Sequence, residues 1–431
     1  MQADLTESVQ ASIRPGEMVD TYYYGETNLE KQAYPCITNT RFVQQFTNLG
    51  SGSSQFVISP NQGVSDMIVE LAMPLVGSGG FSSSTGLALN TGWGYGLVNR
   101  VSVRYGSSAQ YFWSGQQLLL QNLMDAENNQ KCDYILLQGG VAQNGTQIAT
   151  NSGNGNSEKA YLYLKLPHNS CRAAGKPLPF ASDLLVQPIV ITIELLSANA
   201  VFIVQTGGAI GTAPTQLASA QLQVRQEMLT DTSDLLARRV DMNSHAYTFP
   251  LMYFAQQETQ VPVQNATAGA LNSVNLTGFR AGEVRSIVLW LTLNAEQVPG
   301  SGAFAAAKWY PIQQITLTYN GEIFNRFDDG SNQLWNLVSD EKANAVNNIA
   351  FTPATTAGAL VANVSYWVDC PFAQVNVAYD KEMKLCHGKP ILNAVVNLSF
   401  VLPSTAAYTL HAMYIYNASL LCSRGSAEYI F

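Results

Sequence analysis

The sequence repeats itself once, and this internal repeat restricts the possible folds more than any other feature. The segments Gly92–Met124 and Ala307–Ser339 share one order of parts: an aromatic stretch, an alternating strand, a tight turn, a second strand, a glycine and a helix. Matching Tyr105 to Tyr319 gives an offset of 319 minus 105, which is 214 positions. Self-similarity at a fixed spacing indicates that one structural unit occurs twice.

A second pair of segments supports the same alignment. Tyr161–Leu196 matches Tyr366–Leu402, and within them Gly175–Leu178 aligns with Gly388–Ile391 at an offset of 388 minus 175, which is 213 positions. A chain of 431 residues is also longer than one hydrophobic core usually organises. The sequence therefore predicts two copies of one domain, with the boundary near a helix at Thr230–Asp241.

Both copies show the pattern of strands and few helices. Val101–Tyr105 and Tyr161–Leu166 alternate in polarity, so one face of each run packs on a core. Similar short runs, bounded by Gly, Asn, Ser and Pro, recur along the chain and favour a β-sandwich over an α/β fold. The Asn-Gly pair at positions 320–321 predicts a hairpin turn. Helices are predicted at Gly115–Asn128, Thr230–Asp241 and Ser331–Val346.

Polar loops rich in Gly, Ser and Asn separate the strands. A loop of about 20 residues inside a compact domain usually contacts a partner or carries a function, and plain surface decoration is the alternative that the sequence leaves open. Such loops are expected at Gly77–Ser84, Gly139–Glu158, Pro299–Ala306 and Ala354–Ala362.

The charge content limits the partners of the chain. Charged residues make up 12% of the sequence, against about 25% in a typical soluble domain. The net charge is -8, from 22 Lys+Arg and 30 Asp+Glu, and the basic residues are not clustered. Direct nucleic-acid binding is therefore not expected, because it requires clustered cations. Few charges and many amide and hydroxyl groups are suited to broad, wet interfaces between copies.

The chain shows no sequence signal for export. Residues 1–25 lack a basic region followed by an apolar core, and the most apolar runs are shorter than the roughly 20 residues of a membrane-spanning helix. Six cysteines are scattered without C-x-x-C spacing, as is typical of buried thiols in a protein made in a reducing compartment. They are Cys36, Cys132, Cys171, Cys370, Cys386 and Cys422.

No residue pattern indicates catalysis, a cofactor or a metal. Cys370, Cys386 and His387 do not have the spacing of zinc ligands, and Asp328-Asp329 precedes a predicted helix as a cap would. The G-x-G-x-G run at 92–96 precedes a strand, so we interpret it as a flexible approach to a sheet and not as a phosphate-binding loop. The four histidines are far apart in the sequence, and no G-x-S-x-G elbow is present. We predict no catalytic, cofactor-binding or metal residues, no cofactor and no enzymatic activity.

Two aromatic clusters need an explanation. Tyr111-Phe112-Trp113 has a loose counterpart in Ile323-Phe324, which favours packing in the core or between domains over a stacking platform for sugars or bases. Tyr22-Tyr23-Tyr24 has no counterpart in the second half. We expect this second cluster to anchor the N-terminal segment on a neighbouring chain.

The two repeated blocks carry a resemblance to a known family. The series GYGLVNRVSVRYG at 94–106, a following helix rich in Leu and Asn, and an apolar strand that ends at Leu166-Pro167 resemble the double jelly-roll major capsid proteins of icosahedral DNA viruses. That family includes proteins of large DNA viruses, virophages and tailless membrane-containing phages. The resemblance covers Gly92–Asn122, Tyr161–Glu194 and their second-half counterparts.

The resemblance implies a fold and an assembly. The fold would be all-β, with two tandem eight-stranded jelly-roll β-sandwiches, a few short helices and long loops that form outward towers or clamps between subunits. We expect an N-terminal arm at 1–25, the first jelly roll at 26–229, a linker helix at 230–243 and the second jelly roll at 244–431. Three chains would form a pseudo-hexameric homotrimer, since three chains with two similar domains make six similar corners.

The partners implied by the resemblance are other virion components. They are neighbouring capsomers, penton proteins and minor capsid proteins, and the N-terminal arm would reach an internal membrane, the capsid interior or a neighbouring capsomer. The protein would be made inside the host cell and reside in the virion shell. The alternatives from other classes are a tandem β-sandwich carbohydrate-binding or adhesin protein and, third, a sandwich-fold glycoside hydrolase, for which no pair of catalytic carboxylates is identifiable.

Overall fold

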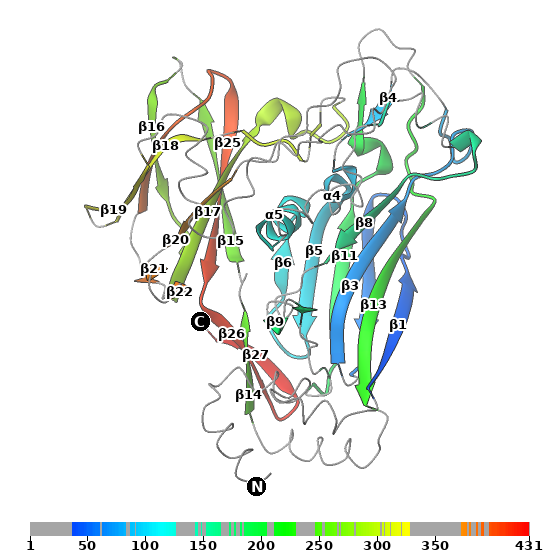
Figure 1. Cartoon of the computed structure of the whole chain (residues 1–431). Helices are drawn as coiled ribbons and strands as arrows, with labels where there is room; N and C mark the ends of the chain where they lie inside the picture. Colours follow the sequence, from blue (N-terminus) through cyan, green and yellow to red (C-terminus); the bar gives the residue numbers. More distant parts are fainter. Residues whose placement is uncertain are drawn as a thin grey trace.

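Two β-sandwiches stand side by side in the computed structural model (Figure 1). The structure describes residues 37–125, 143–229, 246–327 and 372–430, apart from short gaps within these ranges. The first sandwich consists of two four-stranded antiparallel sheets, with strand orders β1-β13-β3-β8 and β2-β11-β5-β6. Its strands are β1 (Ile37–Gln45), β2 (Gly52–Ile58), β3 (Gly63–Ala72), β5 (Val98–Tyr105), β6 (Tyr111–Trp113), β8 (Lys159–Tyr163), β11 (Ile189–Leu195) and β13 (Ser219–Leu229).

The second sandwich has the same topology as the first. Its sheets have the orders β15-β25-β17-β20 and β16-β24-β18-β19. When the eight strands of each domain are counted along the chain, both domains show the orders 1-8-3-6 and 2-7-4-5, which is the jelly-roll arrangement. The predicted all-β fold of two eight-stranded jelly rolls is confirmed. The strands are β15 (Ala255–Gln264), β16 (Leu271–Leu276), β17 (Glu283–Leu293), β18 (Gln313–Tyr319), β19 (Glu322–Phe327), β20 (Phe372–Asn376), β24 (Val396–Val401) and β25 (Ala407–Tyr416).

Alternating polarity explains why these segments form sheets with one buried face. In β11 the sequence IVITIEL buries every second side chain from Ile189 to Leu195 and leaves those between them partly exposed. The sequence VNLSFV of β24, the equivalent strand, begins with the same alternation. The inward faces of the two sheets in each domain together form its hydrophobic core.

Tyr105 and Tyr319 occupy the same place in the two domains. Tyr105 ends β5 and pairs with Ile189, the first residue of β11. Tyr319 ends β18 and pairs with Val396, the first residue of β24. The offset of 214 positions is therefore confirmed at this strand. The predicted hairpin turn at 320–321 is confirmed as well, because Tyr319 pairs with Glu322 and Gly321 has a φ of 81°.

The Gly-Lys-Pro segments match in position along the chain but not in pairing. β10 (Lys176–Pro177) and β23 (Lys389–Pro390) each lie shortly before the seventh strand of their domain. β10 pairs with β9 (Arg172–Ala173), whereas β23 pairs with the start of β17. The two domains therefore share the positions of these short strands but differ in the strands with which they pair.

The helices correct one prediction. The helix predicted at Gly115–Asn128 is present as α5 (Gly115–Asp125). The glycine run at 92–96 is not a flexible approach, because Trp93–Leu97 forms the short helix α4, and all five of its residues are buried. Glycine has a low helix propensity, but tertiary packing overrides it here. The helices predicted at Thr230–Asp241 and Ser331–Val346 lie outside the described residues.

Small sheets and turns complete the structure. Gly139–Glu158 is not entirely a loop, since its residues Gln143–Asn144 form β7, which pairs with β4 (Leu87–Leu89). A separate sheet, in the order β14-β26-β27, lies below the two domains in Figure 1 and includes the last described strand. The remaining elements are β12 (Phe202–Val204), β14 (Ala246–Leu251), β21 (Tyr379–Asp380), β22 (Leu385–Cys386), β26 (Ala418–Ser423), β27 (Ser426–Ile430) and the 3-10 helices η3 (Ala198–Val201) and η4 (Asn294–Glu296).

Candidate functional site

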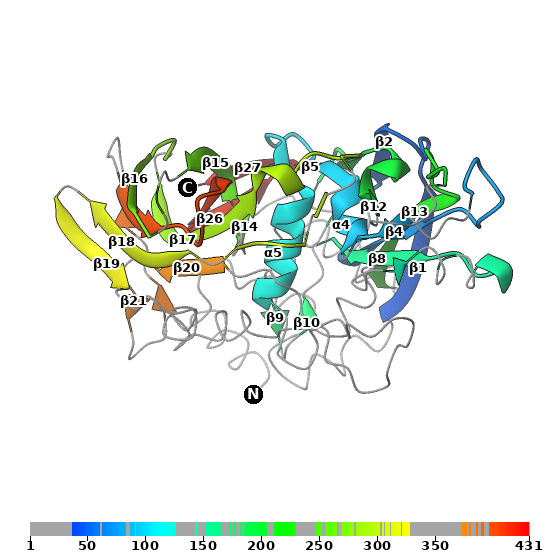
Figure 2. The same cartoon turned by 90° about the horizontal axis from the view of Figure 1, so that it is seen from above.

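The junction between the two jelly rolls is built around helix α5, which lies between the domains in both views (Figures 1 and 2). Gln116, in the first turn of α5, donates a hydrogen bond from Nε2 to Oε1 of Gln297 at 2.5 Å. Its Oε1 accepts a longer hydrogen bond, 3.5 Å, from Nε1 of Trp290 on β17. One amide of the first domain therefore contacts two side chains of the second.

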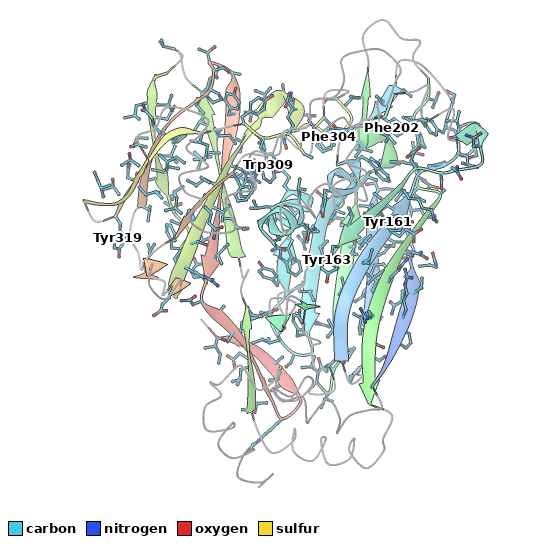
Figure 3. The ribbon with its side chains drawn as sticks, viewed as in Figure 1. Tyr161, Tyr163, Phe202, Phe304, Trp309 and Tyr319 are labelled. Atoms are coloured by element: carbon cyan, nitrogen blue, oxygen red, sulfur yellow. The ribbon has the colours of Figure 1, made fainter. Side chains whose placement is uncertain are left out.

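Trp290 is the centre of an aromatic cluster at this junction. Its indole stacks on the imidazole of His411 with ring centroids 4.9 Å apart and an angle of 7° between the planes. The ring of Trp309, labelled in Figure 3, lies 5.6 Å away. A hydrogen bond also orients the imidazole ring of His411, because its Nε2 lies 2.8 Å from Oγ1 of Thr292. Trp290, Thr292 and Trp309 are fully buried, so these side chains are shielded from bulk solvent.

The segment after β17 completes the junction. Its described residues Gly300 and Phe304 contact the first jelly roll of the same chain, and the expected role of Pro299–Ala306 as a tower or a clamp between subunits stays a prediction. Gly300 donates its backbone N–H to the carbonyl of Ala200 at 3.2 Å. The carbonyl of Phe304, labelled in Figure 3, accepts a hydrogen bond from Nδ2 of Asn90. This segment is therefore a contact within the chain.

A hollow of about 300 Å³ lies at the junction, and its chemistry is uncharged. Asn99 and Gln116 line it from the first domain, and Gln260, Thr292 and His411 line it from the second. No Asp, Glu, Lys or Arg is among its described lining residues. A pair of carboxylates for acid and base catalysis is therefore not present in the lining.

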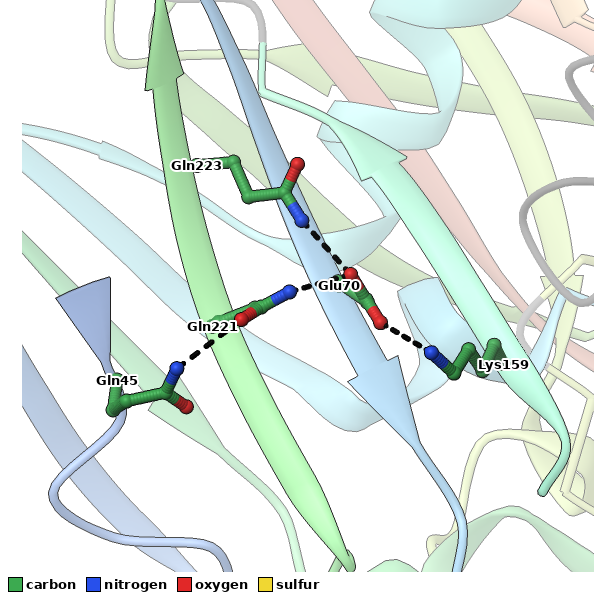
Figure 4. A network of polar contacts seen from close by, with 5 residues as sticks. All are labelled: Gln45, Glu70, Lys159, Gln221 and Gln223. Atoms are coloured by element: carbon green, nitrogen blue, oxygen red, sulfur yellow. Dashed lines mark hydrogen bonds and ion pairs between the residues drawn. The ribbon is translucent and has the colours of Figure 1, made fainter. Parts of the chain in front are cut away.

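A second polar feature lies on the side of the first jelly roll away from the second (Figures 1 and 4). Glu70, near the end of β3, accepts hydrogen bonds from Nζ of Lys159 at 2.7 Å, from Nε2 of Gln221 at 2.6 Å and from Nε2 of Gln223 at 2.8 Å. Gln45 on β1 extends the network, because its Nε2 donates to Oε1 of Gln221 at 3.1 Å. The network therefore crosses all four strands of the sheet β1-β13-β3-β8.

The environment of Glu70 lowers the pKa of its carboxyl below the ordinary value. Burial acts against ionisation and raises the pKa, but the hydrogen bonds from Lys159 and Gln221 and the positive charges of Lys159 and Arg41 outweigh it together. A lowered pKa in the folded state means that ionised Glu70 stabilises the fold above the ordinary carboxyl pKa. This contribution is lost as the pH falls through the folded-state pKa.

Replacing Lys159 with methionine tests this network. We expect the Lys159→Met variant to lose about 1 kcal/mol of stability at pH 7, a small value because the Lys159 side chain is 44% exposed. The loss should shrink as the pH falls through the lowered folded-state pKa of Glu70 and the carboxyl becomes protonated. Urea denaturation of both proteins from pH 7 to below this pKa measures the difference. An equal loss at both ends of the range would contradict the assignment of Glu70 as the titrating group.

The other candidate residues fall in different places. Tyr111 and Trp113 are buried in the core as predicted, but Phe112 is 41% exposed, with the guanidinium of Arg100 4.2 Å from its ring centroid. Cys422 is a buried free thiol, and burial raises its pKa to about 12. Among the described residues no group of three or more His, Cys, Asp or Glu is placed to hold a metal ion. Cys370, His387, Asp328-Asp329 and Tyr22-Tyr23-Tyr24 lie outside the described residues.

Comparison with solved structures shows the same architecture in viral shells. The PBCV-1 virus capsid matches with a TM-score of 0.58 and 10% sequence identity, over 92% of this chain and 97% of that chain. The mavirus major capsid protein matches with a TM-score of 0.51 and 11% identity, over 92% and 90% of the two chains. The Faustovirus major capsid protein has the same TM-score and coverage at 9% identity.

The fold is the double jelly roll of viral major capsid proteins. No protein-family model and no curated protein matches the sequence. The double jelly roll is therefore recognised by its strand order and by structural matches that cover nearly all of this chain and of the compared chains. The low sequence identity adds little evidence. In the part of the chain that the structure describes, no helix is long and apolar enough to cross a membrane.

Sequence reasoning missed both the junction and the polar network. Gln116 and Trp290 are 174 positions apart, and Glu70 and Gln223 are 153 positions apart, so no local pattern connects them. A signal was present for the network, however. Strand alternation places Glu70 and the glutamines Gln221 and Gln223 of β13 on the outward face, where an amide or carboxylate in every second position indicates a polar sheet surface.

Proposed function

We propose that this chain is a structural major capsid protein that self-assembles into pseudo-hexameric homotrimers and forms an icosahedral virion shell. The observation that carries the proposal is the joining of two jelly rolls of identical strand order into one chain, with a fold that matches viral capsid proteins over about 90% of both chains. Three such chains supply six similar domains, which is what a six-cornered capsomer requires.

The proposed role is structural and involves no catalytic, cofactor-binding or metal residues. The partners are other copies of the chain, neighbouring capsomers, penton proteins and minor capsid proteins, and direct nucleic-acid binding is not part of the role. The low charge of the chain, with 12% charged residues, supports assembly through broad uncharged contacts. The protein would be synthesised in the host cell and become part of the virion.

The domain boundaries are part of the same proposal. Residues 26–229 form the first jelly roll, 230–243 the linker helix and 244–431 the second jelly roll. Residues 1–25 form an arm that reaches the capsid interior, an internal membrane or a neighbouring capsomer. The jelly-roll strands β1 to β13 and β15 to β25 lie within the two proposed domains, which supports this division.

Light scattering on a sizing column tests the proposal. We expect the purified full chain to have a mass near three times 46.7 kDa at low and at high salt, and to resist dilution. Electron microscopy of concentrated protein should then show capsomers or shells. A stable monomer whose thermal stability rises with a sugar would overturn the capsid role and favour the carbohydrate-binding alternative.

A further inference from the structure

A second contact joins the two domains at their base, and the hairpin β26–β27 makes it. β25 belongs to the second jelly roll and ends at Tyr416, and β26 begins at Ala418. The residue between them, Asn417, donates its backbone N–H to the carbonyl of Glu283 at 2.9 Å and its Nδ2 to Oε2 of the same residue at 3.2 Å. This anchor on β17 fixes the point at which the chain leaves the second jelly roll for the base sheet β14-β26-β27 (Figure 1).

The hairpin contacts the first jelly roll through its turn and through β27. The carbonyl of Gly425 accepts a hydrogen bond from the backbone N–H of Val186 at 2.9 Å, and Gly425 also forms a parallel β-bridge with Leu185. The N–H of Ala427 donates to Oγ of Ser107 at 3.3 Å. Ser107 lies between β5 and β6, and Leu185 and Val186 precede β11. Two loops of the first domain therefore hold a hairpin that follows the second domain in the sequence.

The turn of the hairpin is shaped for this contact. Ser423 pairs with Ser426 across a two-residue turn. The turn residues, Arg424 and Gly425, have positive φ values of 49° and 80°, as in the type I′ turns that are favoured in hairpins. A Cβ atom added at Gly425 would lie 2.2 Å from Cγ2 and 3.2 Å from Cβ of Val186. Glycine at this position therefore allows the hairpin to approach the first domain closely.

The contact at the base is small compared with a jelly roll. Two hydrogen bonds and the packing of Ala427 and Tyr429 on the core hold the described part of the hairpin in place. A single hydrogen bond contributes little net stability, and elements held by few contacts open locally while the rest of a fold persists. The hairpin is therefore an element with two states, closed on the first domain or released from it.

We propose that the hairpin β26–β27 is a clasp, whose closing on the first jelly roll sets the angle between the domains and makes the chain competent to assemble. This inference rests on the proposed capsid function and adds a step that precedes assembly. Phe304 joins the domains in the upper half of the molecule, and the clasp joins them at the base (Figures 1 and 3). One contact alone would act as a pivot, whereas two contacts at separate heights fix an angle. A ring of similar units closes only when the rotation between neighbours is correct, so a chain with an open clasp should not assemble.

Cys422, on β26, reports whether the clasp is closed. Its side chain is 1% exposed, and burial raises the pKa of the thiol to about 12, so a maleimide reacts slowly while the hairpin is in place. Peptide mass spectrometry distinguishes this site from the other native cysteines. In the full-length protein, Ala427→Asp should speed the labelling of Cys422 about 100-fold, because Ala427 is 5% exposed and an unpaired carboxylate is costly to bury.

Ser426→Asp is the matched control for the added charge. Ser426 is the preceding residue of β27 and is exposed, so a carboxylate at this position stays in water. The labelling rate of Cys422 in this variant should stay within about twofold of the wild-type rate. Equal labelling of Cys422 in Ala427→Asp and Ser426→Asp would show that the hairpin is not a clasp.

Light scattering on the same variants tests the step to assembly. Ala427→Asp should be a monomer of 46.7 kDa, whereas Ser426→Asp should be a trimer. Circular dichroism shows whether the jelly rolls remain folded. A folded Ala427→Asp variant that labels rapidly and still forms the trimer would overturn the inference and leave the proposed function standing. A monomeric wild-type protein whose Cys422 is protected would overturn the proposed function, so the two failures are distinguishable.

Gly425→Ala carries the test if Ala427→Asp does not fold. Its added Cβ meets Val186, so Cys422 should be labelled about tenfold faster than in the wild type. Three strained clasps must close in each trimer, so this trimer should also dissociate at a higher concentration. Gly321→Ala is the control, since Gly321 has a φ of 81° in a two-residue hairpin turn and nothing within 4 Å of an added Cβ. Equal labelling and equal dissociation of the two glycine variants would contradict the clasp.

Discussion

Replacing Trp290 with alanine should lower the free energy of unfolding by about 3–5 kcal/mol, the loss typical of a large buried aromatic residue. The indole is fully buried, stacks on His411, lies 5.6 Å from Trp309 and donates to Gln116 of the other domain. Its removal leaves a cavity where the two domains meet. Domain stability is commonly only about 5–15 kcal/mol, so the loss is a large fraction of the total.

Urea denaturation followed by circular dichroism measures the effect of Trp290→Ala, and Phe112→Ala is the control. Phe112 is also aromatic and lies on a strand, but it is 41% exposed, so its removal should cost only about 0.5 kcal/mol. A Trp290→Phe variant should recover most of the loss, because a phenyl ring can still stack on His411. If Trp290→Ala were no more destabilising than Phe112→Ala, the proposed role of this residue at the junction would be wrong.

The sequence predicted the parts of the fold that depend on local pattern. Tyr105 and Tyr319 end equivalent strands as the repeat required, and the helix beginning at Gly115 is present. These features depend on alternation, turn residues and helix propensity over a few neighbouring positions, which is the information that a single sequence carries. The resemblance of the repeated blocks supplied the jelly-roll topology.

The features that sequence reasoning missed depend on tertiary contacts. A run with glycines at 92, 94 and 96 has a poor helix propensity, and α4 forms because all its residues are buried by packing. Phe112 is an exception, because its outward position between the inward residues Tyr111 and Trp113 follows from local strand alternation. Pro299–Ala306 has the composition of an exposed loop, yet its carbonyl and N–H groups find partners on the other domain. Composition does not reveal such partners.

The junction joins the buried hydrophobic residues of the two domains into one cluster. Ridges of side chains from α5, the aromatic cluster around Trp290 and the segment at 299–306 connect the domains at several points. The proposed six-cornered capsomer would require fixed angles between its jelly rolls, which contacts at several points favour. The two domains also approach each other closely at Gly92, where an added side chain would meet Ala307 of the second domain.

Gly92 therefore provides a sharp test of the domain contact. A Cβ atom added at Gly92 would lie 2.6 Å from Cβ of Ala307 in the second domain, which is closer than atoms can pack. Gly92 also has a φ of 67°, so alanine is strained there by about 1–2 kcal/mol regardless of the contact. We expect Gly92→Ala to lower stability through both effects and to loosen the junction.

The control for backbone strain is Gly80→Ala. Gly80 has a φ of 77° and nothing within 4 Å of an added Cβ, so this variant carries the strain without the clash. We expect Gly92→Ala to cost about 1–3 kcal/mol more than Gly80→Ala in urea denaturation, as overpacking does. Adding Ala307→Gly to Gly92→Ala should recover that difference, because it removes Cβ of Ala307, the atom with which the added Cβ clashes. If the double variant were no more stable than expected from adding the two single changes, the strain at Gly92 would be local and the domain contact would not limit this position.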